Sequence, residues 1–166
     1  YPAASTRTSY TIPDGVTTIG YGAFYGCSNL ANITISDSVT TIGQKAFQNM
    51  KALKTIEFGD VTEIGAGAFY NTGIENLNIP KSVKTIKKNA FTQNLQLKSV
   101  TFAADSQLET IEEKAFKNCP EITQITLPDS LKITERKVFE GCEKMTTISI
   151  GTNLEKLGSF SRFPMW

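Results

Sequence analysis

The chain has 166 residues, enough for one domain with a sizeable core, and its 17 Lys and Arg nearly balance its 16 Asp and Glu. The resulting net charge of +1 disfavours nucleic acid or an anionic membrane as a partner, and no stretch approaches the ~20 apolar residues of a membrane-spanning helix. Histidine is absent from the sequence, which removes the most common general base and metal ligand. We therefore expect no membrane insertion, no metal and no cofactor.

A phenylalanine preceded by Ala or Val recurs at intervals of 23, 22, 22, 25 and 23 residues, at Phe24, Phe47, Phe69, Phe91, Phe116 and Phe139. A period of this length with apolar residues at fixed phases is typical of a solenoid. We predict a repeat domain over residues 1–158, of α/β type but mostly β, in about seven coils of 21 to 25 residues. The predicted units are residues 12–34, 35–57, 58–78, 79–101, 102–126, 127–149 and a partial unit at 150–158.

The first unit shows the elements that we expect in every coil. Residues 16–19, Val-Thr-Thr-Ile, predict a short extended stretch that ends at Gly20. The Ala-Phe segment that follows predicts a helical turn or an irregular arc on the far side of the coil. Residues 30–35 then alternate as Leu-x-x-Ile-x-Ile, which indicates a short strand with one buried face. In three units a proline stops that strand, at Pro13, Pro80 and Pro128.

Two regions depart from the pattern. The sixth unit carries Thr134 where an isoleucine is expected, and its neighbours Leu131 and Ile133 are apolar, so we predict a bulge or a register change there. Residues 159–166 abandon the repeat, and we expect an irregular tail. Its apolar residues can cap the open end of the solenoid or be a cloning remnant: Phe160, Phe163, Met165 and Trp166.

Cys27, Cys119 and Cys142 all lie three residues after an anchor phenylalanine. We interpret them as small apolar residues of the core, because free cysteine is among the most buried residue types. Cys119 and Cys142 would be neighbours in adjacent coils, so a disulfide between them stays open at this stage.

The segment Ile12-Pro-Asp-Gly-Val-Thr-Thr-Ile-Gly-Tyr-Gly-Ala-Phe-Tyr-Gly-Cys27 resembles the BspA-like leucine-rich repeat. The resemblance extends from Tyr1 to about Gly158 and implies a right-handed leucine-rich-repeat coil, with its short parallel strands on the concave face. It also implies a surface or secreted protein of a host-associated microbe, in a family where some members are adhesins and no catalytic residues are shared. The opening residues 1–9 lack the pattern of a signal peptide, so either a signal has been removed or the chain is a segment of a longer protein. We expect a segment of a longer extracellular or cell-surface protein, because Tyr1 begins close to a repeat with no obvious cap.

The variable positions of the Leu-x-x-Ile-x-Ile strands are the candidate binding residues, because they point away from the core. They form a neutral surface rich in hydroxyl and amide groups that can hydrogen-bond to a protein segment or a glycan; the alternative is a solvated face whose threonines only favour strand formation. The candidates are Asn32, Thr34, Thr55, Glu57, Asn76, Asn78, Ser99, Thr101, Gln124, Thr126, Thr147 and Ser149.

The charged residues before each anchor, such as Lys87, Glu112, Glu113 and Arg136, are interpreted as a solvated outer face. Adjacent carboxylates such as Glu112 and Glu113 seldom converge across a glycosidic bond, so we expect no enzyme. The preferred hypothesis is adhesion to a host or matrix protein. The alternatives are a structural spacer that projects another domain and a carbohydrate-active accessory.

Overall fold

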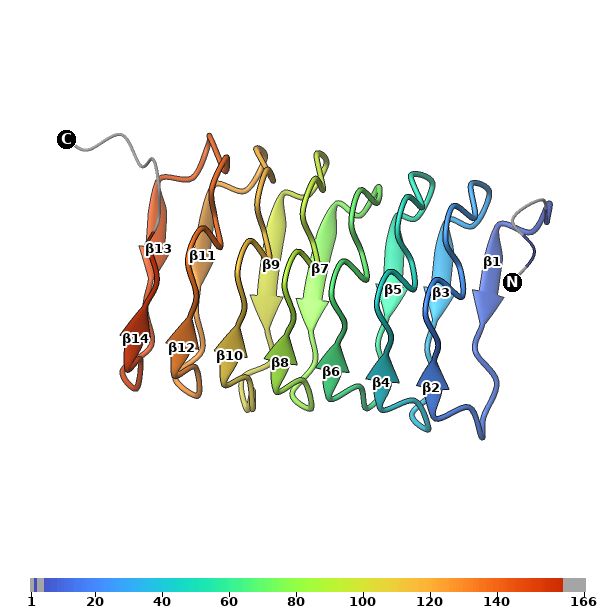
Figure 1. The fold of residues 1–166 in the computed structure, drawn as a ribbon, viewed down its shortest axis with the longest axis horizontal. Helices are drawn as coiled ribbons and strands as arrows, with labels where there is room; N and C mark the ends of the chain where they lie inside the picture. The colour runs from blue at the N-terminus through green and yellow to red at the C-terminus, as the bar shows by residue number, and fades with distance from the viewer. Residues whose placement is uncertain (1, 3–4, 160–166) are drawn as a thin grey trace.

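A computed structural model describes residues 2 and 5–159 of the chain. Its strands form two rows, and each coil contributes one strand to each row (Figure 1). The first row consists of β1 (Ser9–Thr11), β3 (Asn32–Thr34), β5 (Thr55–Glu57), β7 (Asn76–Ile79), β9 (Ser99–Phe102), β11 (Gln124–Thr126) and β13 (Thr147–Ser149). The second row consists of β2 (Thr18–Ile19), β4 (Thr41–Ile42), β6 (Glu63–Ile64), β8 (Thr85–Ile86), β10 (Thr110–Ile111), β12 (Ile133–Thr134) and β14 (Lys156–Leu157).

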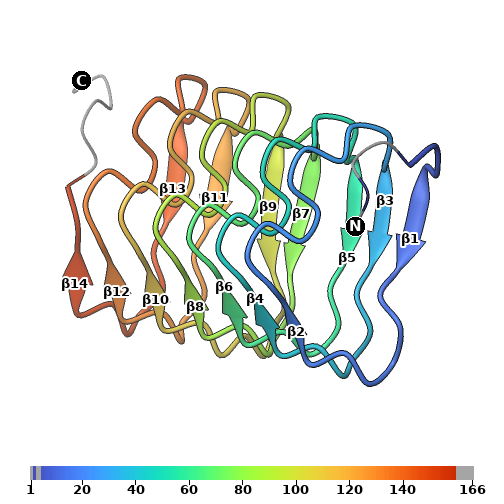
Figure 2. The same cartoon turned by 45° about the vertical axis from the view of Figure 1, so that its right-hand side comes forward.

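The strands pair in parallel with equivalent residues of the next coil, as in Asn32↔Thr55 and Thr18↔Thr41. Neighbouring parallel strands cannot be joined by a hairpin, so the chain completes a full turn between them. Figure 2 shows the stacked coils, with the two rows and the connecting arcs surrounding a common core. The predicted leucine-rich-repeat type of solenoid is confirmed. Residues 5–159 contain no helix, and so none that could cross a membrane.

The arc of each coil is built from turns, and two residues in the left-handed region flank its phenylalanine. Around Phe47 these are Lys45 (φ 59°) and Asn49 (φ 63°), and equivalent residues have positive φ in the other five arcs. Such residues cannot continue a right-handed helix, so the irregular arc is confirmed and the helical turn is wrong. The arc backbones nevertheless pair between coils, as when Phe47 N donates to Ala68 O over 2.8 Å.

The anchor phenylalanines form a continuous stack through the core. From Phe24 to Phe139, neighbouring ring centroids lie 4.9 to 5.7 Å apart and the ring planes differ by 16° or less. Around the stack pack the buried alternate residues of both rows, such as Ile33 and Ile42. The core is therefore a ribbon shared between coils, as expected for a solenoid.

The position three residues after each anchor is buried, and in the last three coils its side chain donates a hydrogen bond to the preceding coil. The thiol of Cys119 donates to Phe91 O at 3.2 Å, and Asn94 Nδ2 donates to Phe69 O at 2.9 Å. All three cysteines are buried free thiols, as predicted for core residues, with no bridge between Cys119 and Cys142. Burial raises the pKa of the Cys142 thiol to about 11, which keeps it protonated at neutral pH.

The prediction of a bulge or register change in the sixth unit is wrong. β12 pairs with β10 in the regular register, Thr110↔Ile133 and Ile111↔Thr134. Thr134 thus occupies the isoleucine position and is fully buried, while its Oγ1 accepts a hydrogen bond from Gly158 N at 3.1 Å. The backbone keeps its register because the buried Thr134 hydroxyl is hydrogen-bonded. Threonine in place of isoleucine therefore loses apolar contact but leaves no buried polar group unpaired. The predicted cap at Phe160–Trp166 lies outside the described residues.

The first row is interrupted at two places, whereas the second row is one seven-stranded sheet. In the first row, hydrogen bonding joins β1-β3-β5, then β7-β9, then β11-β13. Strands begin 23 residues apart within each of these groups, but 21 apart from Thr55 to Asn76 and 25 apart from Ser99 to Gln124. The second row and the arcs stay paired where the coil length changes to 21 or 25 residues. The change in length therefore interrupts only the first row.

Candidate binding face

The twelve predicted binding residues lie in two lines along the exposed side of the first row. We call this surface the first-strand face. One line runs from Asn32 to Thr147 and the other from Thr34 to Ser149, and the buried residues between them, such as Ile33 and Ile125, hold the strands against the core. The alternation predicted from the sequence therefore places all twelve candidates on one surface.

Eight of the candidates bond to one another across paired strands. Thr55 Oγ1 donates to Asn32 Oδ1 at 2.6 Å, and Thr34 Oγ1 donates to Glu57 Oε2 at 3.1 Å. On β7 and β9 the same pattern recurs, with Ser99 Oγ donating to Asn76 Oδ1 at 2.7 Å and Thr101 Oγ1 donating to Asn78 Oδ1 at 3.1 Å. These hydroxyl donors are already used by the fold, which leaves them less free for a ligand.

The last four candidates differ. Gln124, Thr126, Thr147 and Ser149 are exposed on β11 and β13, and their side chains form no hydrogen bond with any other residue that the structure describes. In the free protein their polar groups face water. A ligand can therefore use all of their donors and acceptors without breaking a bond inside the protein.

A hollow of about 700 Å³ opens on this face where the first row is interrupted between β9 and β11. Ser99 and Thr101 line it from one strand, Gln124 and Thr126 from the other, and Phe102 and Ile150 add apolar surface. Ala103, Ala104 and Ser106, which precede β10 in the lengthened fifth unit, lie at its edge. The sequence shows that the unit at 102–126 is two residues longer than most units, but it does not reveal the hollow, because the hollow depends on which strand row absorbs the extra length.

A row of ion pairs runs along the edge of the first-strand face, and sequence reasoning missed it. Glu75 bonds to Lys98 at 2.9 Å and to Lys54 at 3.3 Å, from the coils on either side. The hydrogen bonds from Lys98 and then from Lys54 lower the pKa of the Glu75 carboxyl. These charges neutralise one another, so the face remains nearly neutral. The sequence signal for this row is the alternation of Lys54, Glu75 and Lys98 at the same position of successive repeats.

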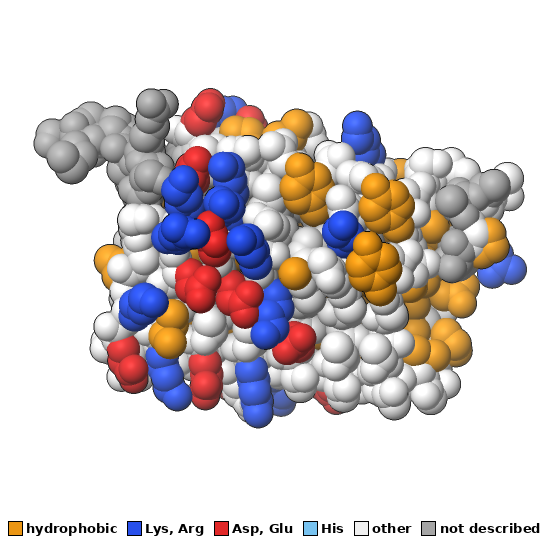
Figure 3. All heavy atoms as spheres, viewed as in Figure 1, with side chains coloured by type: hydrophobic (Ala, Val, Ile, Leu, Met, Phe, Trp, Pro, Cys, Tyr) orange, Lys and Arg blue, Asp and Glu red, His pale blue; other side chains and the backbone are white. Residues whose placement is uncertain are grey.

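The arcs carry a second surface, the arc face, on which charge is unevenly distributed. Figure 3 shows acidic and basic side chains gathered over β8 to β12 and hydrophobic side chains over β2 to β6. In the charged half the Glu113 carboxylate contacts Lys114 at 2.9 Å, Lys88 at 3.1 Å and Arg136 at 3.2 Å. The solvated outer face predicted here is thus an ion-pair network that links three coils.

Glu112 and Glu113 are poorly suited to glycosidase chemistry. Hydrogen bonds from Lys114 and Lys88, with the charge of Arg136, lower the pKa of Glu113 to about 2. A general acid at neutral pH requires the opposite shift. Glu112 bonds to Lys87 at 3.3 Å and accepts a hydrogen bond from Lys88 N at 2.9 Å. Both carboxylates stabilise the stack of coils. No group of three or more possible metal ligands occurs in residues 5–159.

The sequence profile described as the BspA type leucine rich repeat region, with six copies, matches residues 3–102 and 62–163. The chain belongs to the BspA-type leucine-rich repeat family. The predicted resemblance is therefore confirmed over nearly the whole chain. No curated protein is similar enough to this BspA-type chain to count as a relative.

Solved structures of bacterial leucine-rich repeat proteins share the fold. A leucine-rich repeat protein from Bacteroides ovatus is 33% identical with a TM-score of 0.82, over 93% of this chain and 40% of its own. The pneumococcal vaccine antigen PcpA is 28% identical with a TM-score of 0.78, over 90% and 40%. A leucine-rich cell surface protein from Faecalibacterium prausnitzii is 25% identical with a TM-score of 0.60, over 88% and 48%. The chain thus spans less than half the length of each of these proteins.

Proposed function

We propose that the chain is a non-catalytic binding segment of a cell-surface protein, and that its first-strand face adheres to a host or matrix protein. The observation that carries this proposal is the group of exposed polar side chains on β11 and β13 that have no partner within the described fold. Gln124 and Thr126 line the hollow between β9 and β11, and Thr147 and Ser149 lie next to them on β13. The similarity to a cell surface protein supports the location, and the similarity to a vaccine antigen is consistent with it.

The chemistry of the face favours a partner segment in extended conformation. The face offers hydroxyl and amide groups in two parallel lines, and the hollow adds apolar surface from Phe102 and Ile150. An extended peptide carries one donor and one acceptor per residue with alternating side chains, so its polar groups can meet the lines while apolar side chains enter the hollow. With few formal charges on the face, we expect slow, weakly salt-dependent association.

The test measures binding of the purified chain to immobilised fibronectin, fibrinogen and laminin by surface plasmon resonance. We expect saturable binding to at least one of them. Gln124→Lys combined with Thr147→Lys should weaken it about tenfold or more, since Gln124 lines the hollow, Thr147 lies opposite it on β13, and two long cations would cover this part of the face. Asn32→Lys combined with Thr55→Lys, on a pair already bonded internally, should have a smaller effect.

The matched control is Thr17→Lys combined with Thr40→Lys, which adds the same charge at exposed threonines just before β2 and β4. This control should bind like the wild type. Equal loss in all three variants would mean that added charge, not the first-strand face, controls binding. Silence of the wild type towards every protein in the panel would contradict the adhesion proposal and favour the spacer.

A further inference from the structure

Three tyrosines on the arc face, which we call the tyrosine patch, have no role in the core. Tyr21 is 70% exposed, Tyr25 is 49% exposed, and Tyr70 is half-buried. The position of Tyr21 is occupied by Gln44 and Lys88 in other coils, so the same backbone accepts a polar side chain there. The fold does not require the exposed rings, and keeping them in water gives no stability.

Neighbouring side chains hold two rings of the patch, those of Tyr21 and Tyr25, in place. Asn49 Nδ2 donates to the Tyr25 hydroxyl at 3.1 Å, and Asn71 Nδ2 donates to Asn49 Oδ1 at 2.9 Å. The ammonium of Lys45 lies over the Tyr21 ring, 5.9 Å from its centroid. Side chains that are already oriented lose less entropy when a ligand binds. The patch is therefore preorganised, although it lies on the surface.

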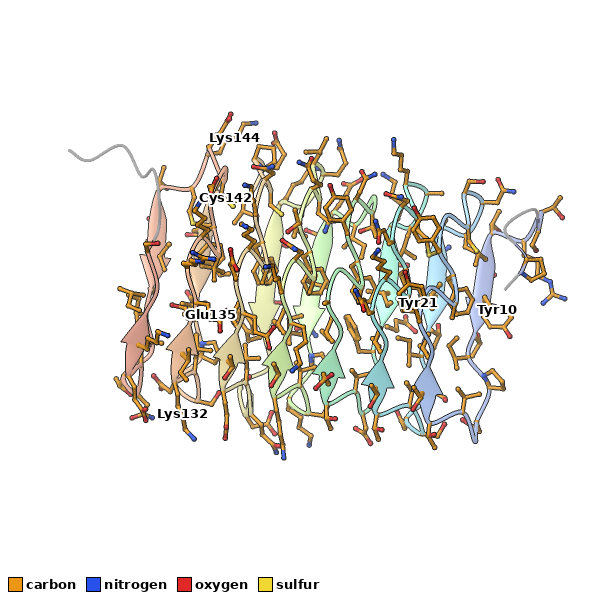
Figure 4. The ribbon with its side chains drawn as sticks, viewed as in Figure 1. Tyr10, Tyr21, Lys132, Glu135, Cys142 and Lys144 are labelled. Atoms are coloured by element: carbon orange, nitrogen blue, oxygen red, sulfur yellow. The ribbon has the colours of Figure 1, made fainter. Side chains whose placement is uncertain are left out.

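The patch is also separated from the charged half of the arc face. The first three arcs contain a single charged residue, Lys45. These arcs are residues 20–27, 43–50 and 65–72. The next three arcs carry the ion-pair network around Glu113. Figure 4 shows Tyr21 towards the N-terminal end of the solenoid and Glu135, in the charged half, towards the C-terminal end. The patch thus offers aromatic rings and amides without carboxylates.

We propose that the tyrosine patch is a binding site for a neutral, linear glycan, separate from the first-strand face. The C–H faces of pyranose rings stack on aromatic rings, and their hydroxyls bond to amides such as those of Gln44, Gln48 and Asn71. A protein interface of the usual kind would instead surround its aromatic anchors with further apolar residues. Gln48 lies between Tyr25 and Tyr70, and around it are glycines and amides.

The spacing of the coils favours an extended, equatorially linked glycan. Successive coils are separated by about 4.8 Å, the strand spacing of a sheet, which is close to the length of one pyranose unit. Tyr25 and Tyr70 are two coils apart, so they can stack on alternate sugars of a chain that runs along the solenoid axis. An α-linked glycan is helical, so its sugars would not follow the solenoid axis from Tyr25 to Tyr70.

The experiment is isothermal titration calorimetry of the whole chain with cellohexaose and with chitohexaose. We expect saturable binding of at least one of these neutral probes. Tyr21→Gln combined with Tyr25→Gln should weaken binding about tenfold or more. This variant copies the second coil, which has Gln44 and Gln48 at these phases, so the fold should tolerate it. The matched control is Arg136→Gln combined with Glu140→Gln, at the same phases of the sixth coil, which should bind like the wild type.

Two results would overturn the glycan site: failure of both probes to bind the wild type, or equal binding by the tyrosine variant. Loss of binding to a matrix protein in the tyrosine variant, with no glycan bound by the wild type, would also overturn it and identify the patch as a protein contact. The proposal about the first-strand face is tested separately, because the lysine variants at Gln124 and Thr147 leave the tyrosine patch intact.

Discussion

Replacing Phe91 by alanine tests the continuous stack of phenylalanines. Phe91 is 1% exposed, and its ring lies between those of Phe69 and Phe116, at centroid distances of 5.1 and 5.2 Å and interplanar angles of 3° and 4°. The substitution would remove a ring that contacts both neighbouring coils. It would leave a cavity in the middle of the core.

The expected loss is at the upper end of the range for buried Phe→Ala substitutions, about 4 to 5 kcal/mol of unfolding free energy. Two stacked pairs are lost, each worth about 0.5 to 1.5 kcal/mol beyond the buried area. The cavity cannot readily collapse, because backbone hydrogen bonds fix the coil on both sides, from Phe69 N to Ala90 O at 2.8 Å and from Phe91 N to Ala115 O at 2.7 Å.

Urea unfolding followed by circular dichroism measures the loss. The control is Leu95→Ala, an exposed residue of the same coil, which should change the free energy by less than about 0.5 kcal/mol. If Phe91→Ala does not fold, Phe91→Leu keeps much of the volume and should cost about 1 to 2 kcal/mol. A Phe91→Ala protein as stable as the wild type would refute the stack and the repeat phases assigned from it.

Three further substitutions test other features of the stack of coils. Asn94→Ala should destabilise by about 2 to 3 kcal/mol in the same urea assay, because the amide bonds to two buried carbonyls of the chain; Asn94→Cys, which copies later coils, should cost less. Glu113→Gln should destabilise most at neutral pH: folding lowers the carboxyl pKa from 4.5 to about 2, so its contribution is complete above 4.5 and is lost as the pH falls towards 2. The difference from the wild type should therefore shrink with acidification, and a constant difference would rule out the ion-pair explanation. Exchanging Ile133 and Thr134, as Ile133→Thr with Thr134→Ile, restores the usual repeat and should raise the melting temperature by about 2 to 4 °C for each kcal/mol gained; a lower melting temperature would show that the Thr134 hydroxyl is worth more than the apolar contact.

The repeat phases of the fold could be predicted from the sequence because the apolar positions recur in nearly every coil. Errors arose where one residue was interpreted alone. Thr134 suggested a register change, but the backbone pairing of its neighbours and the bond to Gly158 N hold it in place. The arcs were ambiguous because Lys45 and Lys114 adopt a left-handed conformation that is normally associated with glycine and asparagine.

The candidate face was predictable as a surface but not as a site. Period-two alternation places residues such as Asn76 and Gln124 on the same side of the row. It does not reveal that Asn76 is bonded to Ser99 while Gln124 has no partner within the described part of the chain. Both residues lie on paired strands, Asn76 opposite Ser99 and Gln124 opposite Thr147, so the alternation and the strand pairing do not decide which side chains bond to each other.

Hydrogen–deuterium exchange with and without a bound matrix protein is the most direct test of where the chain binds. The proposed function predicts that the ligand slows exchange in β9, β11 and the segment that follows β11, around the hollow. Exchange in β2, β4 and β6 should be unchanged. Protection confined to the second row or to the arcs would contradict the first-strand face as the binding surface.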